Sequence, residues 1–325
     1  MDKLPGHLDR QVSSGLKNPS EAWKQLMQKN DELSSPVIIG GVGGSGTRVV
    51  ADIINQLGFY IGGDLNPAKD NLWFLLLFKR PRWFGRARHD KKNIFTGLSL
   101  FSKAMLRQTG PGWPELRFLI RAVLEISIFG HNHKGDGRGL WPFVRAWNMV
   151  ARQPQMPLNQ NRWGWKEPNS HIYLEYLADY FSKFKYIHTI RHGLDMAFSE
   201  NQQQLYNWGP IFGLELPTSR SDEPAASLKF WIESNRRVME IGEKLGDQTF
   251  LIVNFDRLCL SPKSEIQKIV SFLNIEPDAE KLEALNRIPQ KPKSLGRYRA
   301  QNISQFDPAD LNALENLGFS TAADS

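Results

Sequence analysis

With 325 residues, 41% hydrophobic side chains and a net charge of +7, the chain is long enough for a sizeable globular core and basic enough to bind anions. Its single cysteine, Cys259, excludes an intramolecular disulfide and a cysteine metal cluster. The longest apolar run, residues 72–78, is far shorter than the roughly 20 residues of a membrane-spanning helix, and the first 20 residues have no apolar core. We therefore expect a cytoplasmic protein without a secretory signal or transmembrane segment.

The first predicted elements are a helix, a strand and a second helix. Residues 21–33 carry a helical pattern of apolar side chains. Residues 36–42, PVIIGGV, form a short β-branched run that ends in glycines, which is typical of a buried parallel strand. Residues 47–59 have apolar side chains at helical spacing and a stop signal at Gly58. A glycine-rich loop thus joins a strand to a helix.

Residues 67–160 differ from this pattern. They hold many aromatic and arginine side chains with several proline and glycine breaks, and residues 129–139, FGHNHKGDGRG, indicate a loop. We expect helices and loops here, inserted above the sheet.

The remaining chain alternates between strands and helices. Strands are expected at residues 185–191 and 249–258, and helices at residues 192–205, 228–246 and 263–275. This alternation predicts an α/β fold with a central, mostly parallel sheet flanked by helices, in a single domain over residues 1–325.

The glycine-rich loop, GVGGSGTR at residues 41–48, keeps the two glycines of the nucleotide-triphosphate loop GxxxxGK[ST]. Thr47 replaces the lysine, and Arg48 replaces the hydroxyl residue that holds magnesium. This counts against a kinase or nucleotide hydrolase, which remains the alternative enzyme class. Backbone N–H groups at a helix start bind anions. The residues expected to hold one are Gly43, Gly44, Ser45, Gly46, Thr47 and Arg48.

Arg191 is expected at the end of a strand, and Ser199 lies eight residues later in the following helix. The fold could therefore bring a guanidinium and a hydroxyl to one anion.

Together, GVGGSGTR, the Arg191 and Ser199 pair, WKEP at residues 165–168, VNFDRL at residues 253–258 and SLGRYR at residues 294–299 resemble the sulfotransferases that use 3′-phosphoadenosine 5′-phosphosulfate (PAPS). The resemblance covers residues 36–66, about 163–208, 249–262 and about 290–310. The GTR ending is similar to heparan sulfate sulfotransferases, and WKEP to tyrosylprotein sulfotransferases.

The resemblance implies a P-loop-like sulfotransferase fold and a role for each motif. The loop grips the 5′-phosphosulfate of PAPS, while Arg191 and Ser199 grip the 3′-phosphate. The basic segment with Arg297, Tyr298 and Arg299 closes over the 3′-phosphate. The reaction leaves 3′-phosphoadenosine 5′-phosphate (PAP) and sulfates a hydroxyl or amine of an unidentified carbohydrate, lipid or small molecule.

One position departs from the family pattern. Many family members have Lys or Arg immediately before SGT, where this chain has Gly44. The resemblance then implies that Lys166, or as second choice Arg48, supplies the missing positive charge. The base that takes the acceptor's proton is expected to be Asp64, with Asp70 as the runner-up.

Other functions stay open at this point. Gly44 also fits a protein that binds PAPS or PAP without catalysing transfer. The basic and aromatic residues 78–89 could contact nucleic acid or a membrane surface, although we expect no nucleic-acid partner. His131 and His133 have no third ligand at suitable spacing, so no metal site is expected. The acceptor and the oligomeric state are not readable from the sequence.

Overall fold

The computed structural model describes residues 35–106, 110–151 and 161–321. The helix predicted at residues 21–33 lies outside them. Among the helices described, none has the length and apolar content to cross a bilayer.

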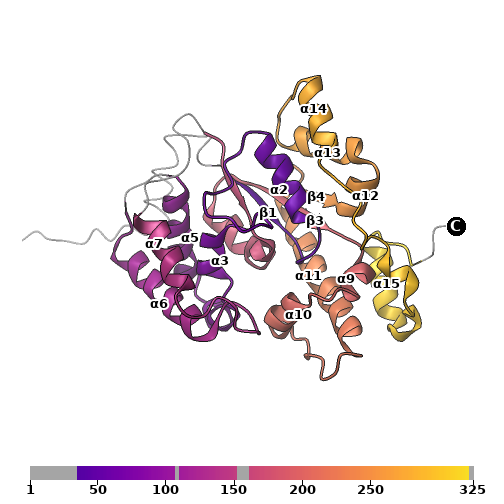
Figure 1. The fold of residues 1–325 in the computed structure, drawn as a ribbon, viewed down its shortest axis with the longest axis horizontal. Coiled ribbons are helices and arrows are strands. Elements are labelled where there is room, and N and C mark those ends of the chain that lie inside the picture. The colour runs from indigo at the N-terminus through magenta and orange to yellow at the C-terminus, as the bar shows by residue number, and fades with distance from the viewer. Residues whose placement is uncertain (1–34, 107–109, 152–160, 322–325) are drawn as a thin grey trace, which may run out of the picture.

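A four-stranded parallel sheet forms the centre of the fold (Figure 1). Its strand order is β2-β1-β3-β4, and every neighbouring pair is parallel. The strands are β1 (Val37–Gly40), β2 (Gly164–Lys166), β3 (Lys185–Ile190) and β4 (Phe250–Asn254). Since the strands are parallel, the loops that follow them meet at one edge of the sheet, where ligands of open α/β sheets bind.

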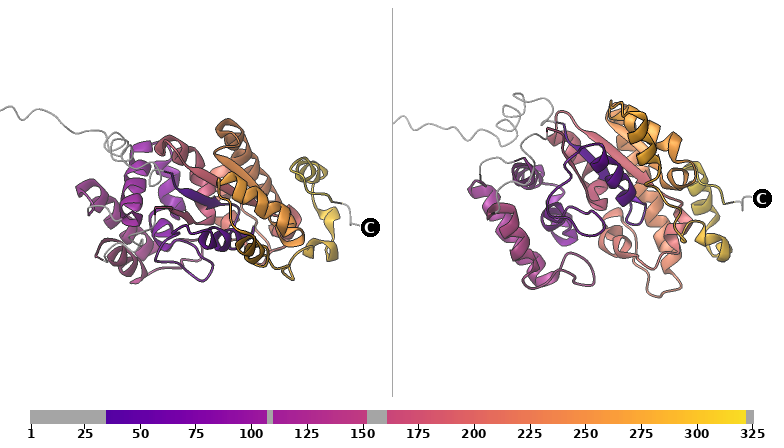
Figure 2. Two further views of the ribbon diagram at one scale, coloured as in Figure 1. Left: turned by 90° about the horizontal axis from the view of Figure 1, so that it is seen from above. Right: turned by 45° about the horizontal axis from the view of Figure 1, so that its top comes forward.

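Strand β1 is buried on both faces, as expected for a parallel sheet. Its side chains alternate between two hydrophobic clusters, because successive side chains of a strand point to opposite faces. Ile39 packs with the apolar side of α2 (Thr47–Gln56) and α13 (Pro262–Phe272). Ile38 packs with the cluster of α3 (Leu72–Phe78), α8 (Leu174–Tyr180) and α11 (Glu223–Leu245). The two further views place α2 and α13 side by side (Figure 2).

Residues 67–151 are helices and loops, as predicted. Figure 1 shows this helical group on one flank of the molecule, opposite the C-terminal helices. Its remaining members are α4 (Pro81–Ala87), α5 (Lys91–Met105), α6 (Trp113–Phe129) and α7 (Trp141–Ala151). The predicted loop at residues 129–139 corresponds to the connection between α6 and α7.

The last part of the chain contributes short elements around the sheet. The remaining α-helices are α9 (Gly193–Ala197), α10 (Gln203–Trp208), α12 (Phe255–Leu260), α14 (Ala279–Asn286) and α15 (Pro308–Asn316). The 3-10 helices are η1 (Pro168–Tyr173), η2 (Gly209–Phe212), η3 (Arg297–Ala300) and η4 (Ile303–Gln305).

The structure corrects the extent of two predicted elements. The helix expected at 192–205 is two helices, because the Gln202 side-chain amide donates to the carbonyls of Met196, Ala197 and Ser199 and ends α9. The strand expected at 249–258 ends at Asn254, whose side chain accepts the N–H of Arg257 at 3.0 Å and caps α12. Strand β2 was not predicted, since three residues are too few to show a periodicity.

Candidate functional site

The loop between β1 and α2 is shaped by its glycines. Gly46 precedes α2 with a φ of 87°, and a Cβ there would lie 2.0 Å from the Phe255 ring. Gly44 has a φ of 94°. Left-handed backbone favours glycine. The N–H groups of Thr47 and Arg48 open α2, and the first N–H groups of a helix have no intrahelical acceptor. The loop therefore presents N–H donors at a helix start, which is an arrangement that binds anions.

Two further polar groups of the loop are informative. The Ser45 hydroxyl is buried and has no hydrogen-bond partner among the described residues. The Gly43 N–H donates to Gln204 Oε1 at 2.8 Å. A carboxamide oxygen thus occupies one N–H group of the loop, in the way that an anionic oxygen would.

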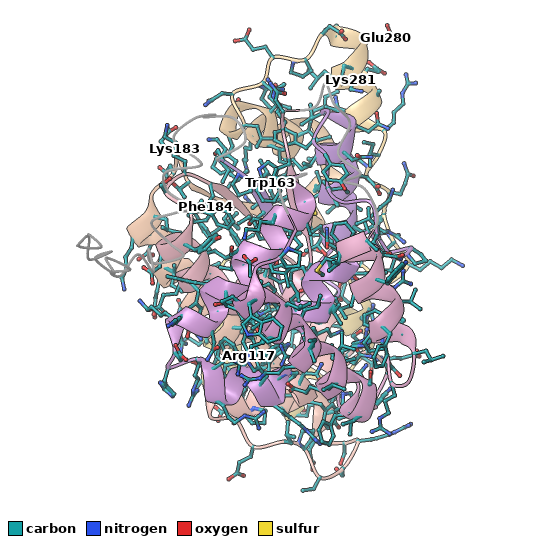
Figure 3. All side chains as sticks on the ribbon, turned by 90° about the vertical axis from the view of Figure 1, so that its left-hand side faces the viewer. Arg117, Trp163, Lys183, Phe184, Glu280 and Lys281 are labelled. Carbon is teal, nitrogen blue, oxygen red and sulfur yellow. The ribbon has the colours of Figure 1, made fainter. Side chains whose placement is uncertain are left out.

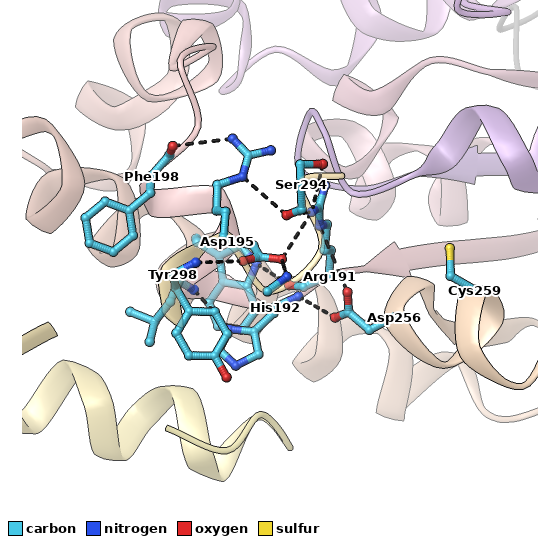
Figure 4. A network of polar contacts seen from close by, with 12 residues as sticks. Arg191, His192, Asp195, Phe198, Asp256, Cys259, Ser294 and Tyr298 are labelled. Carbon is cyan, nitrogen blue, oxygen red and sulfur yellow. Dashed lines mark hydrogen bonds and ion pairs between the residues drawn. The ribbon is translucent and has the colours of Figure 1, made fainter. Parts of the chain in front are cut away.

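The second group of site residues surrounds the end of β3 (Figure 4). Arg191 Nη2 donates to the carbonyl of Ser294 at 2.5 Å, and Arg297 Nε donates to the same carbonyl at 3.3 Å. Arg191 is buried, and its Nε has no hydrogen bond within the described part of the chain. Burial is the main cause that lowers the pKa of Arg297, and the nearby charge of Arg191 adds to it. Two guanidinium groups therefore share one small region.

The acidic residue that holds this region together is Asp195. Its Oδ2 accepts from Arg191 Nη2 at 3.1 Å and from the Gly296 N–H at 2.7 Å, and its Oδ1 accepts from the Tyr298 N–H at 3.2 Å. The Tyr298 ring stacks on His192 with centroids 4.2 Å apart. The C-terminal basic segment is therefore attached to the end of β3.

The other residues predicted here lie close by. Ser199 is partly buried, and its hydroxyl accepts the Asn201 N–H at 3.3 Å. Arg297 Nη1 donates at 3.3 Å to the carbonyl of Phe198, which is the residue before Ser199. Ser199 also lines a cavity of about 820 Å³. Arg299 is exposed, with its guanidinium 5.9 Å from the centre of the Tyr298 ring. The described contacts thus connect the Ser199 region to Arg297, but not Ser199 itself to Arg191.

The predicted catalytic lysine ends strand β2. Lys166 is only 2% exposed, and its Nζ donates to the Ala68 carbonyl at 3.0 Å and to Asp70 Oδ1 at 2.5 Å. The next residues are joined to β1 and to the start of the loop, because Glu167 N–H donates to Ile39 and Pro168 accepts from Gly41. The WKEP segment therefore lies beside the glycine loop.

The remaining candidate catalytic residues, Asp64, Asp70 and Arg48, differ in burial and in their hydrogen-bond partners. Asp64 Oδ1 binds Arg145 Nη1 at 2.6 Å, while its Oδ2 is buried and has no hydrogen bond to any described residue. Asp70 is committed to Lys166 and also accepts from the Asn66 side chain at 2.8 Å. Arg48, the second residue of α2, is exposed.

A buried acid that the sequence did not reveal lies next to Lys166. Glu167 is 1% exposed, and its Oε1 accepts from Asn169 Nδ2 at 2.6 Å. Its Oε2 has no partner among the described residues. Burial, followed by repulsion from Asp70, raises the pKa of Glu167 to about 7. The sequence does show an acidic residue in WKEP, which was the available signal for a functional acid here. Its burial depends on η1 and could not be predicted from the sequence.

Glu167 is connected to the loop by side-chain amides. Asn169 Oδ1 accepts from Trp208 Nε1 at 2.7 Å and from Gln204 Nε2 at 2.9 Å. Indole N–H groups only donate, so this contact fixes which end of Asn169 faces Glu167. Gln204 in turn accepts the Gly43 N–H. The buried acid therefore helps to orient a chain of amides that ends at the glycine loop.

Comparison with known proteins now identifies the family. Residues 36–279, about three quarters of the chain, match the family model "Sulfotransferase family". The chain belongs to the sulfotransferase family. A search of curated protein sequences gives no significant match.

This sulfotransferase is also similar to solved structures at low identity. The sulfotransferase domain of the Synechococcus PCC 7002 olefin synthase is 15% identical, with a TM-score of 0.45 and coverage of 89% of this chain and 95% of that one. Sulfotransferase STF9 from Mycobacterium avium is 14% identical, with a TM-score of 0.44 and coverage of 92% and 82%.

Family membership confirms the general prediction of sulfuryl transfer. A sulfotransferase needs a sulfonate donor and an acceptor. Phosphoryl transfer, a related reaction, relies mostly on positioning and electrostatic stabilisation. Within the described residues, no three His, Cys, Asp or Glu side chains are placed to hold a metal ion together.

Proposed function

We propose that this sulfotransferase uses PAPS as its donor and releases PAP. The observation that carries the proposal is the pair of guanidinium groups, Arg191 and Arg297, that converge on the Ser294 carbonyl at the end of β3. Strand β3 is the neighbour of β1, which leads into the glycine loop. The site therefore offers two separate places for anions, and PAPS carries a phosphosulfate and a 3′-phosphate.

Each place has groups that fit its part of the donor. We assign the 5′-phosphosulfate to the loop N–H groups of Gly43 to Arg48 and to the Ser45 hydroxyl, which is buried without a partner in the described chain. We assign the 3′-phosphate to Arg191 and Arg297, with Ser199, Tyr298 and Arg299 at its borders. Charged hydrogen bonds of this kind are stronger than neutral ones. In this proposal the loop binds its anion as in heparan sulfate sulfotransferases, to which its GTR ending is similar.

Catalysis in the proposal uses Lys166 as the positive charge that Gly44 does not supply. Lys166 ends β2, and the residues after it are hydrogen-bonded to β1 and Gly41. Its ammonium group forms an ion pair with Asp70 in this structure, so the negative charge that develops in the transition state must compete with Asp70 for it. Arg48 remains the second choice, since it is exposed at the start of α2.

The proposed base is Asp64, with Asp70 as the runner-up. A base needs an oxygen that can accept a proton. Asp64 Oδ2 has no hydrogen bond to a described residue, whereas both oxygens of Asp70 are engaged by Lys166 and Asn66. Arg145, which holds the other oxygen of Asp64, belongs to α7. This contact supports the helices of residues 67–160 as the acceptor region for a hydroxyl or amine. The single cysteine supports a reducing, cytoplasmic setting.

Calorimetry with PAP and AMP tests the donor assignment. We expect PAP to bind much more tightly than AMP, and Arg191→Ala to weaken PAP binding by about ten- to hundredfold with little effect on AMP. Arg287→Ala, which removes an exposed arginine at the C-terminal end of α14, is the matched control. Equal affinities for PAP and AMP would contradict the proposal. Tight PAP binding without sulfation of any carbohydrate, lipid, peptide or phenol would instead identify a PAP(S)-binding protein without catalysis.

A further inference from the structure

The outer side of α6 and α7 is unusually apolar for a surface. Of the thirteen large apolar side chains that are exposed in the described residues, ten lie within residues 113–150. We define the outer α6–α7 face by six of them, which are Trp113, Ile120, Leu124, Ile128, Phe143 and Trp147. Trp147 is 70% exposed and Trp113 67%. The two helices are packed side by side, and a concentration of exposed apolar side chains of this kind usually marks an interaction site.

Helical spacing shows that α6 has two apolar sides. Phe118, Ala122 and Ile126 are buried against the protein core. Ile120, Leu124 and Ile128 follow one another at intervals of four residues and form the opposite, exposed side. Packing of α6 inside the protein therefore does not account for its outer residues.

The charges on this face are of one sign. Arg117 and Arg121 are exposed on α6 and have no ion pair within the described residues. Figure 3 shows α6 on the side turned to the viewer, with Arg117 labelled. The two acids of α6 are both engaged, Glu115 by Ser99 and Lys103 and Glu125 by Arg80. Helix α7 contains no acidic residue. The face therefore combines apolar side chains with uncompensated positive charge.

We propose that the outer α6–α7 face binds the surface of an anionic phospholipid bilayer. Tryptophan and aliphatic side chains enter the boundary between headgroups and acyl chains, while arginines attract anionic headgroups. A second copy of the chain fits less well, because a symmetric contact would bring Arg117 and Arg121 near the same arginines of the partner without acids to pair with them. The proposal is independent of the donor and acceptor assignments.

Vesicle flotation of the full-length protein tests this. We expect binding to vesicles of phosphatidylcholine mixed with phosphatidylglycerol, weak binding to phosphatidylcholine alone, and loss of binding as salt is raised. The pair Arg117→Glu and Arg121→Glu should lower affinity by at least about 25-fold, since each basic residue near an anionic surface contributes about a factor of five. The pair Ile128→Glu and Trp147→Glu should lower it by about tenfold or more by removing the apolar contacts.

Matched variants separate this face from net charge. Lys244→Glu with Lys263→Glu makes the same change in charge at exposed positions on α11 and α13, and Leu260→Glu replaces an exposed apolar residue on α12. Both controls should keep vesicle binding. Equal loss in the lysine pair and the arginine pair would overturn the proposal. An absence of vesicle binding would also overturn the proposal. If the protein that fails to bind vesicles is a dimer in sedimentation, and Trp147→Glu dissociates this dimer, the occupant of the face is a second copy of the chain.

Discussion

The carboxylate of Asp195 accepts the backbone N–H of Gly296 at 2.7 Å, across a separation of 101 residues. The same oxygen accepts from Arg191, and the other oxygen accepts from the Tyr298 N–H. One buried acid thus orients the proposed 3′-phosphate arginine and attaches the basic C-terminal segment that is proposed to cover it.

Replacement of this acid should therefore affect both stability and binding. Asp195→Asn exchanges one acceptor oxygen for an amide that meets N–H donors, and it leaves Arg191 with only the more distant Asp256, whose Oδ1 lies 4.0 Å from Arg191 Nε. We expect the free energy of unfolding to fall by about 3 kcal/mol and PAP affinity to fall with it. Urea denaturation and calorimetry measure the two effects. Asp247→Asn, at an exposed position, is the control and should change neither. Wild-type PAP affinity in Asp195→Asn would show that the segment does not contribute to nucleotide binding.

The glycine loop gives a second prediction. Gly46→Ala places a Cβ within 2.0 Å of the Phe255 ring and forces alanine into left-handed backbone. We expect PAP binding to be lost, even in combination with Phe255→Ala, because the second change relieves the collision but not the backbone strain. Gly43→Ala is the comparison, since its Cβ meets only the flexible Gln204 side chain at 3.2 Å. Calorimetry measures PAP binding by these variants. Normal PAP binding by the Gly46→Ala and Phe255→Ala double variant would show that the backbone conformation of the loop is not needed to bind the phosphate.

A third prediction concerns Lys166. A charge used only in the transition state alters turnover rather than nucleotide affinity. Lys166→Ala should lower single-turnover sulfate transfer from labelled PAPS by about 10² to 10³, with PAP affinity nearly unchanged.

The ion pair with Asp70 requires a control for this variant, because the lysine's removal leaves a carboxylate unpaired. Lys166→Ala combined with Asp70→Asn removes that difficulty. If the double variant regains wild-type turnover, Lys166 has a structural role and Arg48 becomes the candidate for the positive charge.

The raised pKa of Glu167 predicts how stability depends on pH. Its folded-state value is about 7, against an ordinary value of 4.5, chiefly because of burial. Between these values the folded protein holds a proton that the unfolded chain has released, so stability falls as pH rises through this window. Glu167→Gln cannot titrate and should lack this contribution, which amounts to about 3 kcal/mol. Urea denaturation of both proteins across the window measures it; parallel pH profiles would mean that Glu167 ionises normally.

The sequence predicted the local structure of those parts of the candidate site that are contiguous in the chain. The loop from Gly43 to Arg48 could be located because strand, glycines and helix follow in order, and Arg191 because it ends an apolar run. Contacts between distant segments could not be predicted in this way. Lys166 and Asp70 are 96 residues apart, and their ion pair depends on how the three-residue strand β2 aligns with β1. The burial of Glu167 likewise results from tertiary packing, to which hydrophobic periodicity is insensitive.

The attachment of Gly296 to Asp195 also has a consequence for biosynthesis. The proposed nucleotide site combines the loop at residues 41–48 with the segment at residues 294–299, which is synthesised much later than the loop. Domains fold as their chains emerge from the ribosome. A nascent sulfotransferase can form β1 and α2 before residues 294–299 are made, but Arg191 acquires its partners at Ser294 only after a further 103 residues have been synthesised. A nucleotide bound at the proposed site would therefore stabilise the folded domain but could not assist folding steps that precede the synthesis of residues 294–299.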